Sequence, residues 1–275
     1  MKKILVATDF SPSAQTAIEY AVQMAQKCRS KLVLFHAYHT QPISLDIPVM
    51  DVSLDDIRVQ TLESLQNIRI QLIKQYGDID IECGCKLGFA VDAINDYAIE
   101  NDINIIVMGM QGSSYIGEIL VGSITTSLMQ HAPCPVLVIG PNMTYQGIHK
   151  IVWACDGVKA PNNLVLGQLK KMMATFTGLK IFVANVIAMH AETKNTFESR
   201  VLPIIKIFLQ KEDYSVHSIE NENIVDGINA FVEQENVDLV VMVPRRHAIW
   251  RNLFFEPNTK RMAFHSSVPL LIIQQ

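Results

Sequence analysis

The chain carries the same pattern twice. Residues 3–9, Lys-Ile-Leu-Val-Ala-Thr-Asp, align with residues 150–156, Lys-Ile-Val-Trp-Ala-Cys-Asp, at an offset of 147. Further along the chain, residues 105–108 match residues 239–242 and residues 135–139 match residues 269–273, both at an offset of 134. Ordered matches this far apart indicate duplication of a unit of domain size. The sequence therefore predicts two related domains, residues 1–145 and 146–275.

Within the first copy, short apolar runs alternate with segments of helical period. Ile4–Thr8 and Leu32–Ala37 are almost continuously apolar, which is typical of strands covered on both faces. Between them, apolar residues recur at three- and four-residue steps behind Ser11 and Pro12, which predicts a helix. Later elements are expected as a helix over residues 57–73, a strand near Ile79–Cys83, a helix over Val91–Glu100, a strand over Ile103–Met108, a helix over Ser123–Gln130 and a strand over Val136–Ile139. This alternation predicts an α/β fold with a parallel sheet and helices on both of its faces.

Composition excludes several functional classes. Hydrophobic residues make up 49% of the chain, charged residues 18%, and the net charge is -4, so no polyanion-binding surface and no nucleic-acid partner are expected. No segment approaches the roughly 18 uninterrupted apolar residues of a membrane span. The first apolar run ends at Asp9, unlike that of an export signal. We expect a cytoplasmic protein with no membrane partner.

Two pairs of residues belong to types that bind metals. Cys83 and Cys85 flank a glycine, and His36 and His39 lie three residues apart. Neither pair has a further ligand at a suitable spacing. Alternation along a strand explains the cysteines, and a surface or core position explains the histidines. The five cysteines show no disulfide spacing and are expected to be reduced thiols, and no metal ligand is assigned.

A glycine-rich loop follows the fourth expected strand. Residues 109–125 read Gly-Met-Gln-Gly-Ser-Ser-Tyr-Ile-Gly-Glu-Ile-Leu-Val-Gly-Ser-Ile-Thr. Ligands of open parallel sheets bind beyond the carboxyl ends of the strands, and Gly122-Ser123 leads into a helix whose N-terminus can bind phosphate. The alternative is that the glycines only form turns and that Ser123 only caps the helix. The loop is neither a P-loop nor a dinucleotide-binding Gly-x-Gly-x-x-Gly motif.

The spacing Gly109-x2-Gly112-x9-Gly122-Ser123 resembles the nucleotide-binding signature of the universal stress protein family. Residues 6–11 resemble the family's first strand and loop, and residues 131–138 resemble its last helix-to-strand passage. The resemblance implies two tandem Rossmann-like (adenine nucleotide alpha hydrolase-like) domains, each a five-stranded parallel sheet of order 3-2-1-4-5 flanked by helices. It also implies that the halves associate as a pseudo-symmetric pair through their final strands, 136–139 and 270–273, with a further homodimer as an open question.

The resemblance further implies one ATP site in the N-terminal domain, with Mg²⁺ as a candidate companion of the nucleotide. The implied contacts are Ala7, Thr8 and Asp9 near the ribose and adenine, Ala37 beside the adenine, Met108 and Gly109 beside the ribose, and Gly112, Gly122, Ser123, Ile124 and Thr125 around the phosphates. From chemistry alone, the Asp9 carboxylate can accept hydrogen bonds from sugar hydroxyls or from the adenine amino group. The alternative is that Asp9 caps the helix behind it.

The second copy has a different loop. At the offset of 134, the positions of Gly109, Gly112, Gly122 and Ser123 are occupied by Val243, Arg246, Glu256 and Pro257. Proline lacks an N–H group and a hydroxyl, and the glutamate places a carboxylate where phosphate would need bare backbone. The second domain is therefore expected to lack the site. Its residues 244–255 hold three arginines and three aromatics, which suit an interface or a filled cleft, or alternatively a different anion or a nucleic-acid strand.

The sequence therefore predicts an ATP-binding stress-response protein that acts as a regulatory or sensory nucleotide-binding protein. The first-copy loop shows no positioned general base or electrophilic Lys or Arg, so no catalytic residue is assigned and slow ATP hydrolysis is the most that is expected. One alternative is an interaction module that docks a protein partner through the altered C-terminal loop. Another is a true nucleotide hydrolase.

Overall fold

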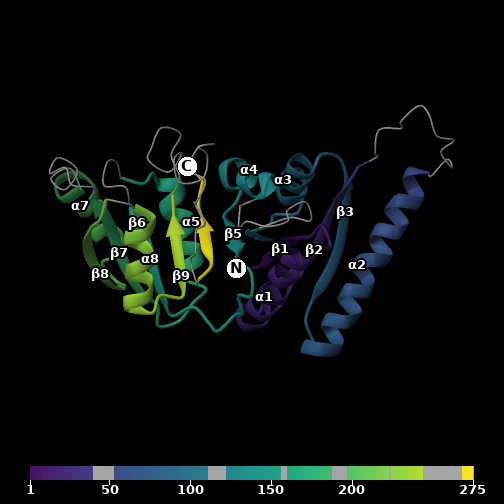
Figure 1. Ribbon diagram of the computed structural model, residues 1–275, viewed down its shortest axis with the longest axis horizontal. Coiled ribbons are helices and arrows are strands. Elements are labelled where there is room, and N and C mark those ends of the chain that lie inside the picture. The colour runs from purple at the N-terminus through teal and green to yellow at the C-terminus, as the bar shows by residue number, and fades with distance from the viewer. Residues whose placement is uncertain are drawn as a thin grey trace.

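Ten strands form one twisted sheet with helices on both faces (Figure 1). The computed structural model describes residues 1–39, 53–110, 122–155, 160–187, 197–222, 224–243 and 268–274. The strand order is β3-β2-β1-β4-β5-β10-β9-β6-β7-β8. The first five strands in this order come from the N-terminal half of the chain, and the other five come from the C-terminal half.

The N-terminal half has the expected parallel order 3-2-1-4-5. Its elements are β1 (Lys3–Ala7), α1 (Pro12–Cys28), β2 (Lys31–Tyr38), α2 (Leu54–Tyr76), β3 (Ile81–Leu87), α3 (Ala90–Glu100), β4 (Ile105–Gly109), α4 (Ser123–His131) and β5 (Val136–Ile139). β3 starts later and runs further than the sequence indicated, because it pairs with β2 as far as Tyr38↔Leu87. The α/β prediction and its strand order are confirmed.

The C-terminal half repeats this parallel order on the other side of the sheet. Its elements are β6 (Lys150–Cys155), α5 (Asn163–Met173), β7 (Lys180–Ile187), a short π-helix η1 (Phe197–Val201), α7 (Leu202–Phe208), β8 (Asp213–Glu220), α8 (Ile224–Glu235), β9 (Leu239–Met242) and β10 (Leu270–Ile272). Asn162 caps α5 by accepting a hydrogen bond from the Val165 N–H at 2.9 Å, as Ser11 caps α1 through the Ala14 N–H at 3.2 Å.

The duplication extends to individual hydrogen bonds. The Asn104 side-chain oxygen accepts from the backbone N–H groups of Lys2 and Lys3, and Asp238, at the equivalent position, accepts from those of His149 and Lys150. The Lys3 ammonium donates to the Asn101 carbonyl at 3.0 Å, and the Lys150 ammonium donates to the equivalent Glu235 carbonyl at 2.8 Å. The same contacts therefore hold the first strand of each half in place.

The two halves meet where β5 and β10 pair antiparallel. Val136, Leu137 and Val138 lie opposite Ile272, Leu271 and Leu270, and all six side chains are buried. The buried apolar cluster on each face of the sheet includes residues from both halves. Near this seam, the Gln274 amide donates to the carbonyls of Leu128 and Met129 at the end of α4, at 3.2 and 3.3 Å.

None of the five cysteines forms a disulfide. Burial raises the pKa of Cys134 to about 12, and burial is also the main cause of the raised pKa of Cys83 and Cys85. Cys83 and Cys85 flank Gly84 in β3, as strand alternation predicted. A raised pKa disfavours the thiolate, which is the reactive form of a cysteine. Within the described ranges, no helix combines the length and apolarity that crossing a membrane requires.

Gly109 allows the first turn of α1 to lie directly against β4. A Cβ atom at this position would come within 2.6 Å of the Ser13 carbonyl oxygen. In contrast, a Cβ atom on Gly167 in α5 would meet no atom within 4 Å. The two glycines therefore form a matched pair for testing this contact.

We expect Gly109→Ala to lower the free energy of unfolding by about 1–3 kcal/mol, because the backbone on both sides of the contact must move. Gly167→Ala should raise it by about 0.5–1 kcal/mol, because alanine favours a helix interior over glycine. Chemical denaturation of both variants measures the two changes. Equal stability of Gly109→Ala and the unchanged protein would contradict the close packing of α1 on β4.

Candidate functional site

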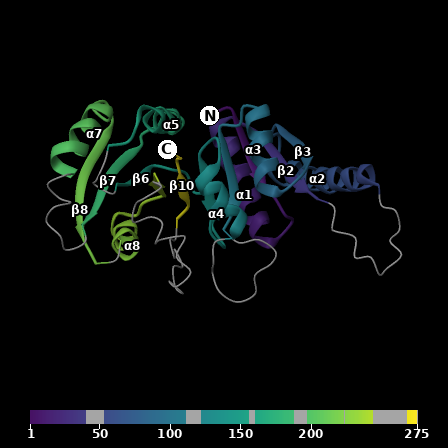
Figure 2. The same ribbon diagram turned by 90° about the horizontal axis from the view of Figure 1, so that it is seen from above.

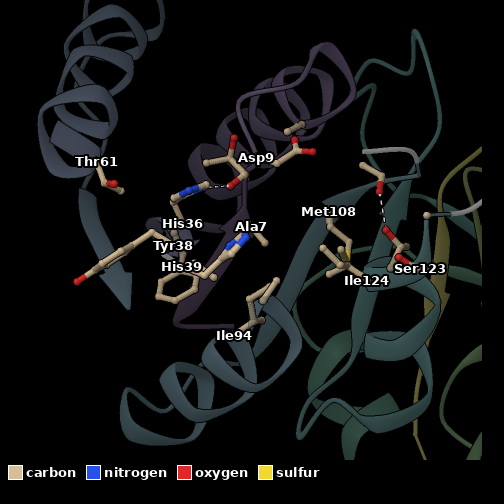
Figure 3. A pocket seen from close by; sticks show the side chains of 18 of the residues that line it. Ala7, Asp9, His36, Tyr38, His39, Thr61, Ile94, Met108, Ser123 and Ile124 are labelled. Carbon is tan, nitrogen blue, oxygen red and sulfur yellow. Dashed lines mark hydrogen bonds between the residues drawn. The ribbon is translucent and has the colours of Figure 1, made fainter. Parts of the chain in front are cut away.

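A cavity of about 550 Å³ opens at the carboxyl ends of the strands in the N-terminal half (Figure 3). It is lined by the following predicted site residues: Ala7, Thr8, Asp9, Ala37, Met108, Gly109, Gly122, Ser123, Ile124 and Thr125. Gly112 lies outside the described residues, as do Asp156, Arg246, Glu256, Pro257 and the rest of residues 244–255. The structure therefore brings together every predicted site residue that it describes.

Sequence reasoning missed part of the cavity wall. The additional lining residues are Ala14, Phe35, His36, Tyr38, His39, Ile57, Thr61, Ala90 and Ile94. Those on β2 lie at the carboxyl end of a strand, where ligands of open parallel sheets bind, so a signal for them existed. Ile57 and Thr61 come from α2 and Ile94 from α3, and the reach of these helices over the sheet edge depends on tertiary packing. Figure 3 shows the β2 side chains on one side of the cavity and Met108, Ser123 and Ile124 on the other.

Local hydrogen bonds fix the end of β1. The Thr8 hydroxyl oxygen accepts from the Phe10 N–H at 3.0 Å, and Asp9 Oδ1 accepts from the Ser11 N–H at 3.1 Å. Phe10 has a φ of 63°, a left-handed conformation that turns the chain sharply into α1. Asp9 therefore forms a turn just before α1, whereas the cap of that helix is Ser11, so the alternative that Asp9 caps the helix is wrong. Asp9 also lines the cavity.

His36 is held rigidly in the wall. Its Nδ1 atom lies 2.7 Å from the Thr8 carbonyl oxygen, so Nδ1 carries the hydrogen and donates it. Its ring packs against Phe10 with 4.7 Å between the ring centroids. The described part of the chain contains no group of three or more His, Cys, Asp or Glu side chains able to hold a metal. The hydrogen bond to Thr8 and the packing against Phe10 therefore fix the His36 ring in the cavity wall.

The start of α4 presents backbone donors to the cavity. The first helical bond runs from the Thr126 N–H to the Gly122 carbonyl at 2.9 Å, so the N–H groups of residues 123–125 precede it. The N-cap is Gly122, and no side chain in the described ranges caps this helix end. The alternative that Ser123 only caps the helix is therefore wrong, because Ser123 is already the first helical residue. Uncapped N–H groups at a helix start favour an anion.

The Thr125 side chain is buried, and its hydroxyl donates to the Gly109 carbonyl at 3.1 Å. The bond ties α4 to the end of β4. A second bond across this loop runs from the Gly122 N–H to the Met110 carbonyl at 2.8 Å. Both ends of the glycine-rich loop are therefore anchored to one another.

The backbone of Ala37 is turned toward the cavity. In a parallel strand, the N–H and C=O of one residue point to the same side, and successive residues alternate. Hydrogen bonds from Lys31 N–H to Lys2 and from Thr8 N–H to Phe35 show that odd-numbered residues of β2 face β1. Ala37 lies beyond the last pair of this ladder, Ala7↔Phe35. Its N–H and C=O therefore point into the space where β1 has ended.

Comparison with known proteins agrees with this architecture. The universal stress protein family model matches residues 1–140. The chain is 30% identical over 138 residues to the universal stress protein in QAH/OAS sulfhydrylase 3'region of Thermus aquaticus, a match that covers 50% of this chain and 98% of that protein. The crystal structure of a universal stress protein from Archaeoglobus fulgidus DSM 4304 matches with a TM-score of 0.69 and 19% identity, covering 99% of this chain and 96% of that one.

A universal stress protein crystallised in complex with cAMP shares 28% identity, with a TM-score of 0.39 and coverage of 50% of this chain and 96% of that one. The match of the family model to half of the sequence decides the assignment. The chain belongs to the universal stress protein family.

Proposed function

We propose that this chain is an ATP-binding stress-response protein with one nucleotide site, the cavity of the N-terminal half, and that it acts as a regulatory or sensory protein. The proposal includes two domains, residues 1–145 and 146–275, which act as an intramolecular pair. The observation that carries it is that two sets of backbone groups face one cavity from different sides. The Ala37 N–H and C=O suit a base, and the N–H groups at the start of α4 suit phosphate.

At the base end, the Ala37 peptide offers one donor beside one acceptor. Adenine carries an amino donor at position 6, next to a ring nitrogen that accepts, whereas guanine carries a carbonyl acceptor there. The Ala37 C=O can therefore accept from the adenine amino group while its N–H donates to the ring nitrogen. Guanine would place its carbonyl acceptor against the Ala37 C=O, an unfavourable contact. Ala7, Met108 and Ile94 supply apolar surface for the faces of the ring.

At the phosphate end, the partial positive charge of the α4 N-terminus adds to its free N–H groups. The Ser123 hydroxyl is exposed at the same place. The Asp9 carboxylate lines the cavity and suits ribose hydroxyls, because it would repel a phosphate placed beside it. A volume of about 550 Å³ falls in the range of small-molecule sites.

Any Mg²⁺ would enter with the nucleotide. Magnesium is usually held by substrate phosphates, waters and one or two carboxylates, so it needs no protein cage. Asp9, the carboxylate that lines the cavity among the described residues, is placed at the ribose, so the proposal leaves Mg²⁺ to the phosphates and water. We assign no catalytic residue, and the proposal concerns binding. We propose the cytoplasm as the compartment, and five cysteines outside any disulfide agree with a reducing environment.

Calorimetric titration of nucleotide-free protein should show one Mg-ATP site per chain. GTP should bind at least about tenfold more weakly, because it leaves the Ala37 donor and acceptor mismatched, at about 1–3 kcal/mol for each unpaired group. Equal affinity for ATP and GTP would contradict the role of Ala37. Competition by cAMP, the ligand of one relative, tests whether adenine without a triphosphate is sufficient.

The Gly122→Glu variant should lose ATP binding, because it copies Glu256 and places a carboxylate at the helix start. Gly122 has φ of -62° and ψ of 153°, which any residue adopts, so the variant should stay folded. Gly122→Ala is the matched control and should keep most of the affinity. The same calorimetric titration measures both variants. Unchanged binding by Gly122→Glu would mean that the phosphates do not lie at α4.

A further inference from the structure

Helix α2 is apolar on two faces. Its inner face buries Thr61, Leu65 and Leu72 against β2 and β3. Val59, Ile70 and Ile73 are exposed, at 52%, 62% and 36%, and Leu62 is half-buried between them. A helix that covers one sheet needs one apolar stripe. The fold of the residues that the structure describes therefore does not explain the second stripe.

We propose that this outer stripe, Val59, Leu62, Gln66, Ile70 and Ile73, binds the same stripe of a second copy of the chain, with the two α2 helices antiparallel. In both views α2 lies at one end of the molecule, outside β3 (Figures 1 and 2). Its outer side is therefore accessible to another molecule without disturbing the seam between β5 and β10.

The spacing of the stripe is symmetric about its centre. Val59 and Leu62 precede Gln66 by seven and four residues, and Ile70 and Ile73 follow it by four and seven. A two-fold axis at Gln66 places Val59 opposite Ile73 of the second copy and Leu62 opposite its Ile70. A two-fold interface must be self-complementary in this way, because both copies contribute the same surface. The palindromic spacing selects a second copy as the occupant.

Charges beside the stripe complement each other in the same arrangement. Asp56 and Lys74 are 18 residues apart, which is five helical turns, so they lie on the same flank of α2. The two-fold axis brings Asp56 within about 3 Å, along the helix axis, of the level of Lys74 in the second copy. Both side chains are exposed, and neither takes part in an ion pair within the described ranges.

The other basic residues of α2 do not oppose this pairing. Arg58 interacts with the Cys85 side chain of β3, on the inner side of the helix. The Arg69 guanidinium donates to Gln66 Oε1 at 3.2 Å, which holds the central amide in place. We expect a pair of single helices to bury less than the roughly 1,200 Å² at which standard-size interfaces begin, and therefore to form a weak, concentration-dependent dimer.

Sedimentation velocity of the full chain over a range of concentrations measures the dimer. We expect a monomer–dimer equilibrium that Ile70→Glu abolishes, because it places two carboxylates in the apolar contact. Ile99→Glu is the matched control: Ile99 is 64% exposed on α3, away from the stripe, and its substitution should leave the equilibrium unchanged. A monomer at all concentrations, or a dimer that Ile70→Glu leaves intact, would overturn the proposal.

A charge exchange tests the antiparallel register. Lys74→Glu places like charges opposite Asp56 and should weaken the dimer several-fold, with two contacts affected by symmetry. Adding Asp56→Lys restores opposite charges and should recover much of the loss. Thermal unfolding of each variant confirms that it is folded. If the double variant is weaker than Lys74→Glu alone, the register is wrong.

Discussion

β1 ends three residues before its neighbour β2, and this difference in length creates the cavity. The ladder between them closes at Ala7↔Phe35, whereas β2 continues beside β3 to Tyr38. The last residues of β2 therefore turn one edge of their backbone toward open space. Because β1 has ended at this level, no neighbouring strand covers this edge of β2. β4 and α4 close the space from the other side. The position of the cavity follows from main-chain hydrogen bonding, so many side-chain sets are compatible with it.

Because the cavity depends on the path of the main chain, features of the site that follow from that path could be predicted from the sequence. Strand order, helix positions and the residues at the strand ends were predictable, because apolar runs, helical periods and the resemblance all bear on the backbone path. The cap of α4 could not be predicted, because a shift of one residue in the helix start moves Ser123 from the cap position into the helix. The Thr125 hydroxyl was assigned to phosphate, yet it donates to the Gly109 carbonyl, a contact that depends on how closely α4 approaches β4.

Helix α2 is a second case in which the sequence predicts an element but not its orientation on the sheet. Its apolar residues predict a helix, and that prediction is confirmed. Periodicity alone does not say which apolar face meets the sheet: Leu65 and Leu72 are buried, whereas Ile73, next to Leu72 in the chain, is exposed. Which face turns toward β2 and β3 depends on the rotation of α2 about its own axis, and tertiary packing sets that rotation. For the same reason, the contribution of Thr61 to the cavity wall could not be read from the sequence.

The seam between β5 and β10 has a consequence for how the two halves can differ. Two identical subunits joined by a two-fold axis must change together, since each substitution appears on both sides. Here the facing strands belong to one polypeptide, so a substitution appears once. The Leu137↔Leu271 contact and the Asn104 and Asp238 bonds match in the two halves, whereas Val243 occupies the position of Gly109 in the second half. Fusion into one chain thus permits lasting asymmetry, with one half free to diverge while the other stays constrained.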